Sequence, residues 1–450
     1  MNKQINIFNT LSGKKEKFIP INNKKVGMYV CGPTVYDFPH IGNARPLVVF
    51  DVLYRLLKKL NGNDNVTYVR NITDIDDKII KASNEKNIDF KKLTDEVTLS
   101  FNEDCKYLGC LKPTFEPKAT DHIEEMIEMI NSLLNKNYAY EKAGHVFFDI
   151  NKFSSYGALS KKTIKDLDAG SRVGISKIKK NPGDFVLWKP SKNNEPSWDS
   201  KFGKGRPGWH IECSAMSKKY LSSNFDIHGG GLDLIFPHHE NEIAQSFCAN
   251  DKLLAKFWVH NGYVTVNKKK MAKSENNFVT INELKKKYNG QTVRLAMLST
   301  HYTQPFDWNE KILKDANTIL DKWYEFYIDE NIHISDNNKK FLLDDLNIPK
   351  MIANIHSLYK KAKDGEEDAA KQLTASCKFL GLFSENKETW FKFNKKTSIK
   401  QEEINKLINE RNSARKNKDF KKSDEIRDYL LKNNILLEDT ENETIWKFKK

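Results

Sequence analysis

The stretch from Cys31 to Asn43, CGPTVYDFPHIGN, decides how the first part of this chain folds. Residues 26–30 (VGMYV) precede it and form a short apolar run that predicts a buried strand. Apolar residues follow it at helical spacing between 48 and 60. A strand therefore leads through a loop into a helix, and Gly42 allows a ligand to come close to the backbone there. The first turn of such a helix offers unpaired N–H groups to an anion.

The same loop also permits a purely structural interpretation. In that case His40 packs against its neighbours or caps the helix, and Asn43 is an ordinary N-cap. These residues alone do not separate the two interpretations.

The composition is that of a large globular protein, since 450 residues suffice for about two to four domains. A net charge of +14 suits a polyanionic partner, but the basic residues are mostly Lys and accompany many Asn, which a genome rich in A and T would also produce. The six cysteines are scattered, so we expect buried, metal-bound or catalytic thiols rather than a disulfide framework. Without a bilayer-spanning apolar run or a signal pattern, a cytoplasmic protein that does not contact the membrane is expected.

Hydrophobic patterns predict an α/β fold with an insertion and a helical C-terminal part. The strand at 66–72 gives a βαβ beginning, and short elements between about 118 and 201 interrupt the α/β pattern. Beyond 281 the chain is mostly helical, with Lys- and Asn-rich linkers expected at 335–340 and 394–400. The other expected strands are 146–149, 184–187, one near Trp258 and 263–266, and the other expected helices are 123–134 and 281–288.

Four residues have the chemistry of a zinc site. His238 and Glu242 are four residues apart, so both would project from one face of a helix, and Cys31 and Cys213 offer thiolates. Two thiolates, one imidazole and one carboxylate suit Zn²⁺. The spacing leaves alternatives open, because His239 or Glu240 would serve as well, or all of these residues would be ordinary surface residues and buried thiols.

Three further segments have residues that suit phosphate or nucleotide binding. The sequence KMAKS at 270–274 is a basic loop whose two Lys heads suit developing charge on a phosphate, although Lys-rich loops are common here. Three glycines at 229–231 allow close approach to a nucleotide or form a plain tight turn. The acidic segment 71–78 would lie where α/β sheets bind ligands, or its carboxylates would cap helices.

These motifs resemble those of the class I aminoacyl-tRNA synthetases, and in particular the cysteine-specific family. The early His-Ile-Gly-His motif of the class stands here as HIGN at 40–43, and the late Lys-Met-Ser-Lys-Ser motif stands as KMAKS at 270–274. Asn43 cannot carry the positive charge of the usual His, and Ala272 lacks one hydroxyl. The resemblance runs nearly end to end, through 31–37, 71–78, 183–189, 206–213, 226–245, 414–415, 418–420, 426–428 and 437–440.

The resemblance implies a two-step reaction. The carboxylate of L-cysteine attacks the α-phosphate of ATP to give cysteinyl-adenylate, and the terminal ribose 2′-OH of tRNA(Cys) then attacks the adenylate carbonyl. A zinc ion that reads the substrate thiolate would make an editing site unnecessary. The implied residues are His40, Lys270 and Lys273 for catalysis, His40, Asn43, Gly230, Asp233 and Lys273 for ATP with Mg²⁺, Thr73 and Trp209 for cysteine, and Cys31, Cys213, His238 and Glu242 for Zn²⁺. Trp209 would wall the side-chain pocket or simply pack in the core.

The resemblance also implies a domain order and a monomer. A Rossmann-like catalytic domain would occupy 1–117 and 202–280, interrupted by a connective insertion at 118–201, with a stem-contact helical bundle at 281–396 and an anticodon-binding module at 397–450. Helices within 312–382 would brace the tRNA. A small core in the last module would include Phe420, Ile426, Leu430, Ile435 and Trp446, the last of which would otherwise stack on a base.

Two other functions fit parts of the sequence. A cysteine ligase of mycothiol synthesis would share the zinc site and adenylate chemistry but lack the anticodon module, which the C-terminal matches argue against. An inactive zinc-containing RNA-binding paralogue is favoured only by Asn43 and Ala272. Cys105, Cys110, Cys248 and Cys377 are expected to be small buried hydrophobic residues.

Overall fold

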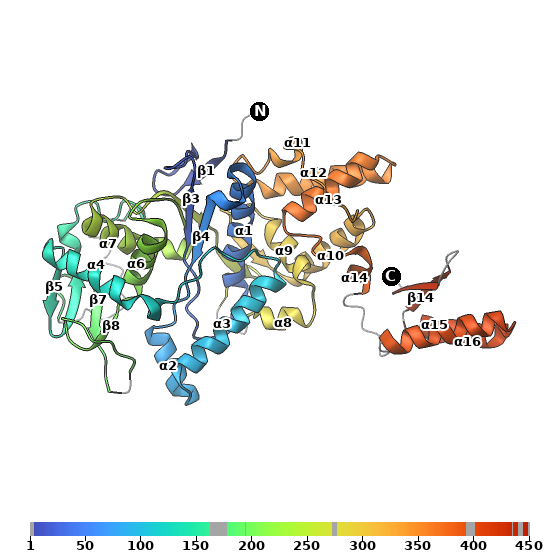
Figure 1. Ribbon diagram of the computed structural model, residues 1–450, viewed down its shortest axis with the longest axis horizontal. Coiled ribbons are helices and arrows are strands. Elements are labelled where there is room, and N and C mark those ends of the chain that lie inside the picture. The colour runs from blue at the N-terminus through green and yellow to red at the C-terminus, as the bar shows by residue number, and fades with distance from the viewer. Residues whose placement is uncertain are drawn as a thin grey trace.

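The computed structural model describes residues 4–162, 178–193, 195–271, 277–392, 401–433, 435–439 and 444–448 (Figure 1). Its centre is a parallel four-stranded sheet of order β10-β9-β3-β4, which confirms the α/β fold. The expected strands at 26–30 and 66–72 are β3 (Val26–Val30) and β4 (Val66–Arg70). The other two strands are β9 (Phe225–Gly231) and β10 (Ala255–Asn261).

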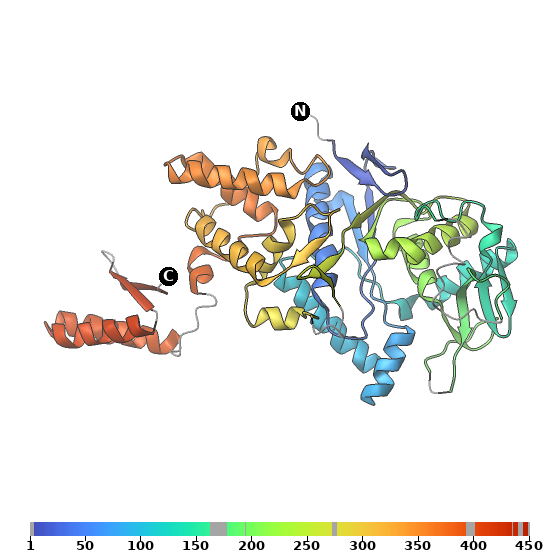
Figure 2. The same ribbon diagram turned by 180° about the vertical axis from the view of Figure 1, so that it is seen from behind.

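The alternation of side chains along β3 divides the interior into two cores. Val26, Met28 and Val30 face the core that contains α1 (Ile41–Asn61), whereas Tyr29 faces the core on the opposite side of the sheet. This second core is built with α4 (Ile123–Asn135), α6 (Trp209–Leu221) and α7 (Glu240–Asn250). The sheet is thus buried on both faces, as parallel sheets generally are (Figure 2).

Two of the acidic residues that follow β4 have structural roles in the segment between β4 and α4. Asp76 caps α2 (Asp77–Lys86) by accepting a hydrogen bond from the Lys78 backbone N–H, and Asp74 accepts hydrogen bonds from Thr120. The capping interpretation is therefore confirmed for Asp76. The helix α3 (Phe90–Tyr107) follows, and two parallel bridges then place 115–118 beside the end of β4.

The insertion forms an antiparallel sheet of order β5-β6-β7-β8, with α4 before it. Its strands are β5 (Ala139–Lys142), β6 (His145–Phe148), β7 (Phe185–Pro190) and β8 (Gly205–Pro207). β8 lies past residue 201, where we expected the insertion to end. Phe148 and Trp188 of this sheet belong to the same core as Tyr29, so the insertion is continuous with the α/β domain.

Two small sheets flank the parallel sheet. β1 (Asn6–Asn9) and β2 (Lys14–Lys17) form a hairpin beside β10, and β11 (Val264–Val266) pairs with both β12 (Lys269–Lys270) and β13 (Phe306–Trp308). Short helical turns are η1 (Asn63–Asn65), η2 (Ala119–His122), η3 (Ile150–Lys152), η4 (Leu232–Leu234) and η5 (Ile235–His239).

The helical part begins at α8 (Ile281–Lys285), which confirms the predicted change of pattern. It continues with α9 (Gly290–Leu298), α10 (Glu310–Tyr324), α11 (Asp336–Lys339), α12 (Ile348–Lys363), α13 (Glu367–Phe379) and α14 (Lys387–Lys392). The linker predicted at 335–340 is wrong. Ser335 caps α11, and Asn338 is buried and donates to the Gln372 side chain. The other predicted linker, 394–400, lies outside the described residues.

The last module is α15 (Gln401–Lys416), α16 (Phe420–Lys432) and the hairpin of β14 (Ile435–Asp439) and β15 (Thr444–Phe448). Ile426, Leu430 and Ile435 form its core, as expected, and the partly buried Trp446 packs against them. Phe420 was wrongly placed in that core: it is the first residue of α16 and is 63% exposed, whereas the core takes Ile426 and Leu430 from later turns of the helix. Across the described part of the chain, none of the helices has the length and apolar character that crossing a membrane requires.

A substitution at Gly229 can test how tightly α1 packs on the sheet. A Cβ atom there would lie 2.3 Å from Phe50 Cε1 of α1, so Gly229→Ala should reduce the free energy of unfolding in urea by ~1–3 kcal/mol. Gly27→Ala in the neighbouring strand is the control, since its Cβ would meet no atom closer than 3.3 Å. Adding Phe50→Leu should recover much of the loss, and equal stabilities of the two alanine variants would contradict the close packing.

Candidate functional site

A cavity of about 920 Å³ opens where the parallel strands end, the usual position of ligands in α/β sheets. The loop after β3, the start of α1 and the segment 261–265 after β10 line most of it. Six of the residues for which the family resemblance implies a role lie on its wall: Cys31, His40, Asn43, Trp209, Asp233 and Lys270. The cavity is large enough for a nucleotide.

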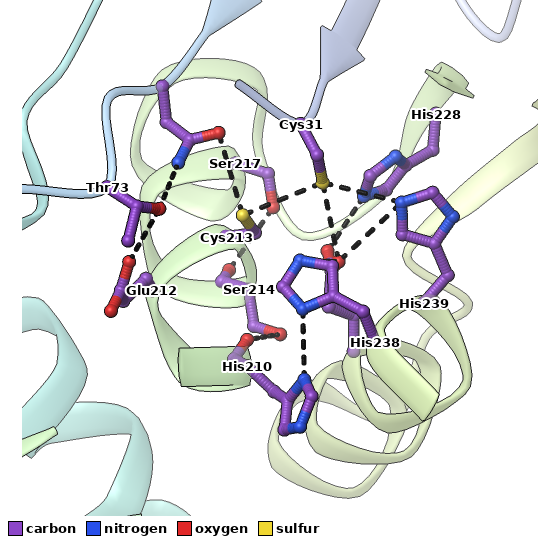
Figure 3. A network of polar contacts seen from close by, with 12 residues as sticks. Cys31, Thr73, His210, Glu212, Cys213, Ser214, Ser217, His228, His238 and His239 are labelled. Atoms are coloured by element: carbon purple, nitrogen blue, oxygen red, sulfur yellow. Dashed lines mark hydrogen bonds and ion pairs between the residues drawn. The ribbon is translucent and has the colours of Figure 1, made fainter. Parts of the chain in front are cut away.

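Beside this cavity the structure brings together the two cysteines, His238 and Glu242 (Figure 3). Cys31 Sγ lies 3.6 Å from Cys213 Sγ and 3.6 Å from Glu242 Oε1, and His238 Nε2 lies 3.0 Å from the same carboxylate oxygen. All four ligand atoms lie within 4.8 Å of one another. Side chains from the loop after β3, from α6, from η5 and from α7 therefore converge on one point, as a metal site requires.

A second set of ligand atoms overlaps the first. Cys31, His228, His239 and Glu242 also lie within 4.8 Å of one another, and Cys31 Sγ is 3.4 Å from His239 Nε2. The alternative ligand Glu240 is used elsewhere: its carboxylate accepts hydrogen bonds from the backbone N–H groups of Gly157 and Ser160. His239 thus remains an alternative, whereas Glu240 is occupied in holding the insertion.

Without a metal, the thiols of this group are protonated and the His238 imidazole is neutral, and both states are compatible with metal binding. Burial raises the pKa of the Cys31 thiol well above its usual value, and the nearby Cys213 and Glu242 raise it further. Burial also raises the pKa of Cys213, and it lowers the pKa of His238 to about 3, so this imidazole is neutral. Neutral imidazole is the form that binds metals, and metal binding displaces the thiol protons.

Further histidines surround these residues, and sequence reasoning did not single them out. His210 Nδ1 lies 2.9 Å from His238 Nδ1, and His228 Nε2 lies 2.7 Å from Glu242 Oε2. His239 Nδ1 lies 2.8 Å from His260 Nε2. The sequence did contain a signal for them, namely the clustering of histidines: five of the eleven fall between 210 and 260.

Thr73 is buried and does not line the cavity. Its hydroxyl donates to Glu212 Oε2 at 3.0 Å and accepts from Asn71 Nδ2 at 3.2 Å. Asn71 Oδ1 in turn accepts the Gly32 backbone N–H and lies 3.6 Å from Cys213 Sγ. Burial raises the pKa of Glu212 well above its usual value. Thr73 is thus part of a buried polar chain that fixes the loop after β3.

Trp209 is not a core residue. Its side chain is 37% exposed, lines the cavity and stacks on the His238 ring with 4.4 Å between centroids. Trp209 therefore forms the part of the cavity wall that adjoins His238.

His40, not Asn43, is the N-cap of α1. Its Nδ1 accepts the Gly42 N–H at 3.1 Å, while Asn43 Oδ1 accepts the His40 N–H at 3.1 Å. A Cβ on Gly42 would lie 2.8 Å from His40 Cε1, so glycine is needed for the ring to fold back. Since Nδ1 accepts, Nε2 carries the proton of the neutral ring. Asn43 preserves the capping box without carrying a charge.

The three glycines end β9 and do not form a tight turn. A Cβ on Gly230 would lie 2.9 Å from His239 Cε1, and one on Gly231 would lie 2.3 Å from Asp233 Oδ1. Gly231 and Asp233 line the cavity, whereas Gly230 packs behind it. Lys270 reaches the cavity from β12, and Lys273 lies outside the described residues.

The fold and the two adjoining sites define a class of protein. A family model described as the catalytic domain of class I (C) tRNA synthetases matches residues 17–318. Among solved structures, methionyl-tRNA synthetase of Mycobacterium tuberculosis with methionyl-adenylate gives a TM-score of 0.55 at 12% identity, over 79% of this chain and 89% of the other. An arginyl-tRNA synthetase assigned in Campylobacter jejuni gives 0.54 at 11% identity, over 81% and 94%. The chain therefore belongs to the class I aminoacyl-tRNA synthetases.

Sequence relatives narrow the class. The cysteine–tRNA ligase of Pelagibacter ubique is 54% identical over the full length of both chains, and that of Rickettsia felis is 48% identical over 99% of this chain and 100% of the other. Within its class the chain belongs to the cysteine–tRNA ligase family, as its motifs led us to expect.

The ligand set can be tested by metal content. After dialysis against zinc, Cys213→Ser should lower zinc affinity at least ~10-fold, because a thiolate ligand is lost. Cys248→Ser is the matched control: Cys248 is equally buried, but it lies in α7 outside both sets of ligand atoms. Zinc content is measured by mass spectrometry of the metal. If His239→Asn lost zinc while Cys213→Ser retained it, the second set would be the correct one.

Proposed function

We propose that this chain activates L-cysteine with ATP and transfers it to tRNA(Cys), with Zn²⁺ selecting the amino acid. The observation that carries the proposal is the adjacency of two features. A thiol-containing group of metal ligands lies against a nucleotide-sized cavity whose wall includes His40 and Lys270. Membership of the cysteine–tRNA ligase family gives the type of reaction. The adjacency of the two features supports the finer mechanism, in which a metal ion selects cysteine beside the bound ATP.

The donor chemistry supports Zn²⁺ held by Cys31, Cys213, His238 and Glu242. Two sulfurs bound to one tetrahedral zinc at ~2.3 Å lie about 3.8 Å apart, close to the 3.6 Å between Cys31 and Cys213. This set includes both thiols, which is the softer of the two available combinations. Bound there, the ion would supply a soft Lewis acid that accepts the substrate thiolate as a further ligand.

This arrangement explains selection without editing. Serine differs from cysteine by one atom, and a pocket that reads size alone distinguishes such a pair only modestly. A hydroxyl is a hard and weakly acidic ligand, so it competes poorly for a soft site. Trp209 closes the side of the pocket, and Asp233 offers a carboxylate on the same cavity wall. Thr73 supports this pocket through its hydrogen bond with Asn71, which holds the loop after β3.

For adenylate formation we assign the phosphate end of ATP to His40, Asn43, Lys270 and Lys273. As the cysteine carboxylate attacks the α-phosphorus and pyrophosphate leaves, negative charge grows on the phosphoryl oxygens. The His40 Nε2–H, the Asn43 amide and the Lys ammonium groups would donate hydrogen bonds to that charge, with Mg²⁺ accompanying ATP. Gly230 would act indirectly, by letting β9 pack against His239.

For transfer, the tRNA 2′-OH attacks the adenylate carbonyl and AMP leaves. We assign anticodon binding to the module of 397–450 and stem contacts to the helices of 281–396. Trp446 packs in its module and has Lys392 Nζ 5.1 Å from its ring centroid, which favours the structural role over base stacking.

The proposed activation step is tested by ATP–pyrophosphate exchange. The zinc-loaded protein should show exchange with cysteine and at least ~100-fold less with serine, and Cys213→Ser should raise the KM for cysteine sharply. Removal of zinc by a chelator should abolish exchange, and added zinc should restore it. Equal exchange with both amino acids would contradict metal-based selection, and charging of tRNA(Cys) separates the synthetase from a cysteine ligase of another substrate.

The roles of the two lysines can be separated from cysteine binding. Lys273→Ala and Lys270→Ala should each lower kcat of exchange by ~100-fold or more, because each removes charge that acts mainly in the transition state. The KM for cysteine should change far less. Lys269→Ala, which removes an exposed neighbour in β12 that does not line the cavity, is the control. Equal losses in kcat and cysteine affinity would indicate a structural role.

A further inference from the structure

Arg45 makes an unusual set of contacts two residues after Asn43. Its side chain is completely buried, and its hydrogen bonds within the described residues all go to backbone carbonyls. Nη1 donates to Met297 O at 3.0 Å, and Nη2 donates to His301 O at 3.1 Å and Gln304 O at 3.0 Å. The guanidinium also lies 5.0 Å from the Phe306 ring centroid. Such a fork fixes position and direction more strictly than an ammonium group.

The carbonyls belong to a segment that leads to the late motif. Met297 lies at the C-terminal end of α9, where carbonyls lack helical partners and a cation is favourable. The turn at 301–304 then enters β13, which is parallel to β11, and β11 carries β12 with Lys270. A rigid path of hydrogen bonds thus joins Arg45 on α1 to the strand that presents Lys270.

The same turn also forms the back of the cavity wall. The Gly262 N–H donates to Tyr302 O at 2.8 Å, and a Cβ on Gly262 would lie only 2.3 Å from Gln304 O. Residues 261–265 line the cavity. A shift of this turn would therefore move both the cavity wall and Lys270.

The other end of the late loop is tied to the His40 turn directly. Ile41 N donates to Val279 O, Ile281 N donates to Pro39 O, and the His40 ring contacts the Phe278 ring edge-on at 4.9 Å. The described residues on the two sides of the late motif, 269–271 and 277–281, are therefore both connected to α1 and its N-cap. On the first side, Arg45 is the α1 side chain that donates hydrogen bonds to the segment 297–304.

We propose that Arg45 is a positioning residue that sets the separation between His40 and Lys270 across the cavity. The proposal rests on the proposed function, since it assigns importance to that separation during adenylate formation. Catalysis depends steeply on such spacing, and an error near 1 Å can cost about 100-fold. Arg45 itself would not touch ATP or cysteine, because it acts through the turn at 301–304.

The test is pyrophosphate exchange by the zinc-loaded full chain, expressed per active site. Arg45→Lys keeps the charge but loses the fork, so kcat should fall ~10- to 100-fold. The KM for cysteine and the zinc content should stay within about twofold, because the metal ligands lie on other elements. Gly262→Ala should give the same pattern, since it displaces the same turn from the opposite side.

Arg294→Lys is the matched control. Arg294 is also fully buried and bonds to the carbonyls of Leu108 and Leu380, but its contact on α1 is Asp51, in the middle of the helix. This variant should lower thermal stability and leave kcat per active site unchanged. The proposal is overturned if Arg45→Lys retains kcat within twofold of the wild type, or if Arg294→Lys lowers kcat equally.

The failure of the proposed function would look different. It would appear as absent cysteine-dependent exchange in the wild type, or as unchanged exchange in Lys270→Ala. The role of Arg45 would then be decided by binding of a nonhydrolysable ATP analogue. Weaker binding by Arg45→Lys than by Arg294→Lys would support the positioning role, and equal affinities would overturn it.

Discussion

The burial of the Glu242 carboxylate is the constraint on which this site depends. The side chain is completely buried, and leaving it without partners would cost several kcal/mol or more. His228 and His238 lie within 3.0 Å of its two oxygens, and Cys31 approaches from the loop after β3. These partners come from different elements, so the sheet, η5 and α7 must all be in place. The group of candidate metal ligands is therefore a property of the assembled fold rather than of a local motif.

The position of the nucleotide cavity follows from the parallel sheet. The loops after β3 and β4 run side by side, since Val35 N donates to Thr73 O and Thr73 N donates to Pro33 O. This pairing carries the strand geometry beyond the sheet and leads β3 into the N-cap of α1. The helix then presents His40 and Asn43 to the cavity, while α9 and the turn after it approach from behind through Arg45. The candidate metal ligands and the cavity thus lie at the same edge of the parallel sheet.

The sequence predicted the local parts of this arrangement well. The apolar run at 26–30 and the helical spacing after Val48 predicted β3 and α1. The i, i+4 spacing of His238 and Glu242 correctly predicted that the two side chains lie close together. Contacts between distant segments were not accessible in this way. Composition suggested a linker at 335–340, but Asn338 is buried by Gln372 of α13. Phe420 is apolar yet exposed, and the partners of His210 and His260 lie more than 20 residues away.

The continuous second core couples the insertion to the candidate metal ligands. Cys213 belongs to the same apolar cluster as Phe148 and Trp188 of the inserted sheet, and Cys31 packs against that cluster. The insertion and α6 should therefore open and close as one cooperative unit, with similar amide exchange rates on both sides of the boundary. Transient opening of the inserted sheet would expose a thiol to solvent and oxidants. The stability of the inserted sheet would thus set how often the Cys31 and Cys213 thiols are exposed, although the insertion supplies neither of them.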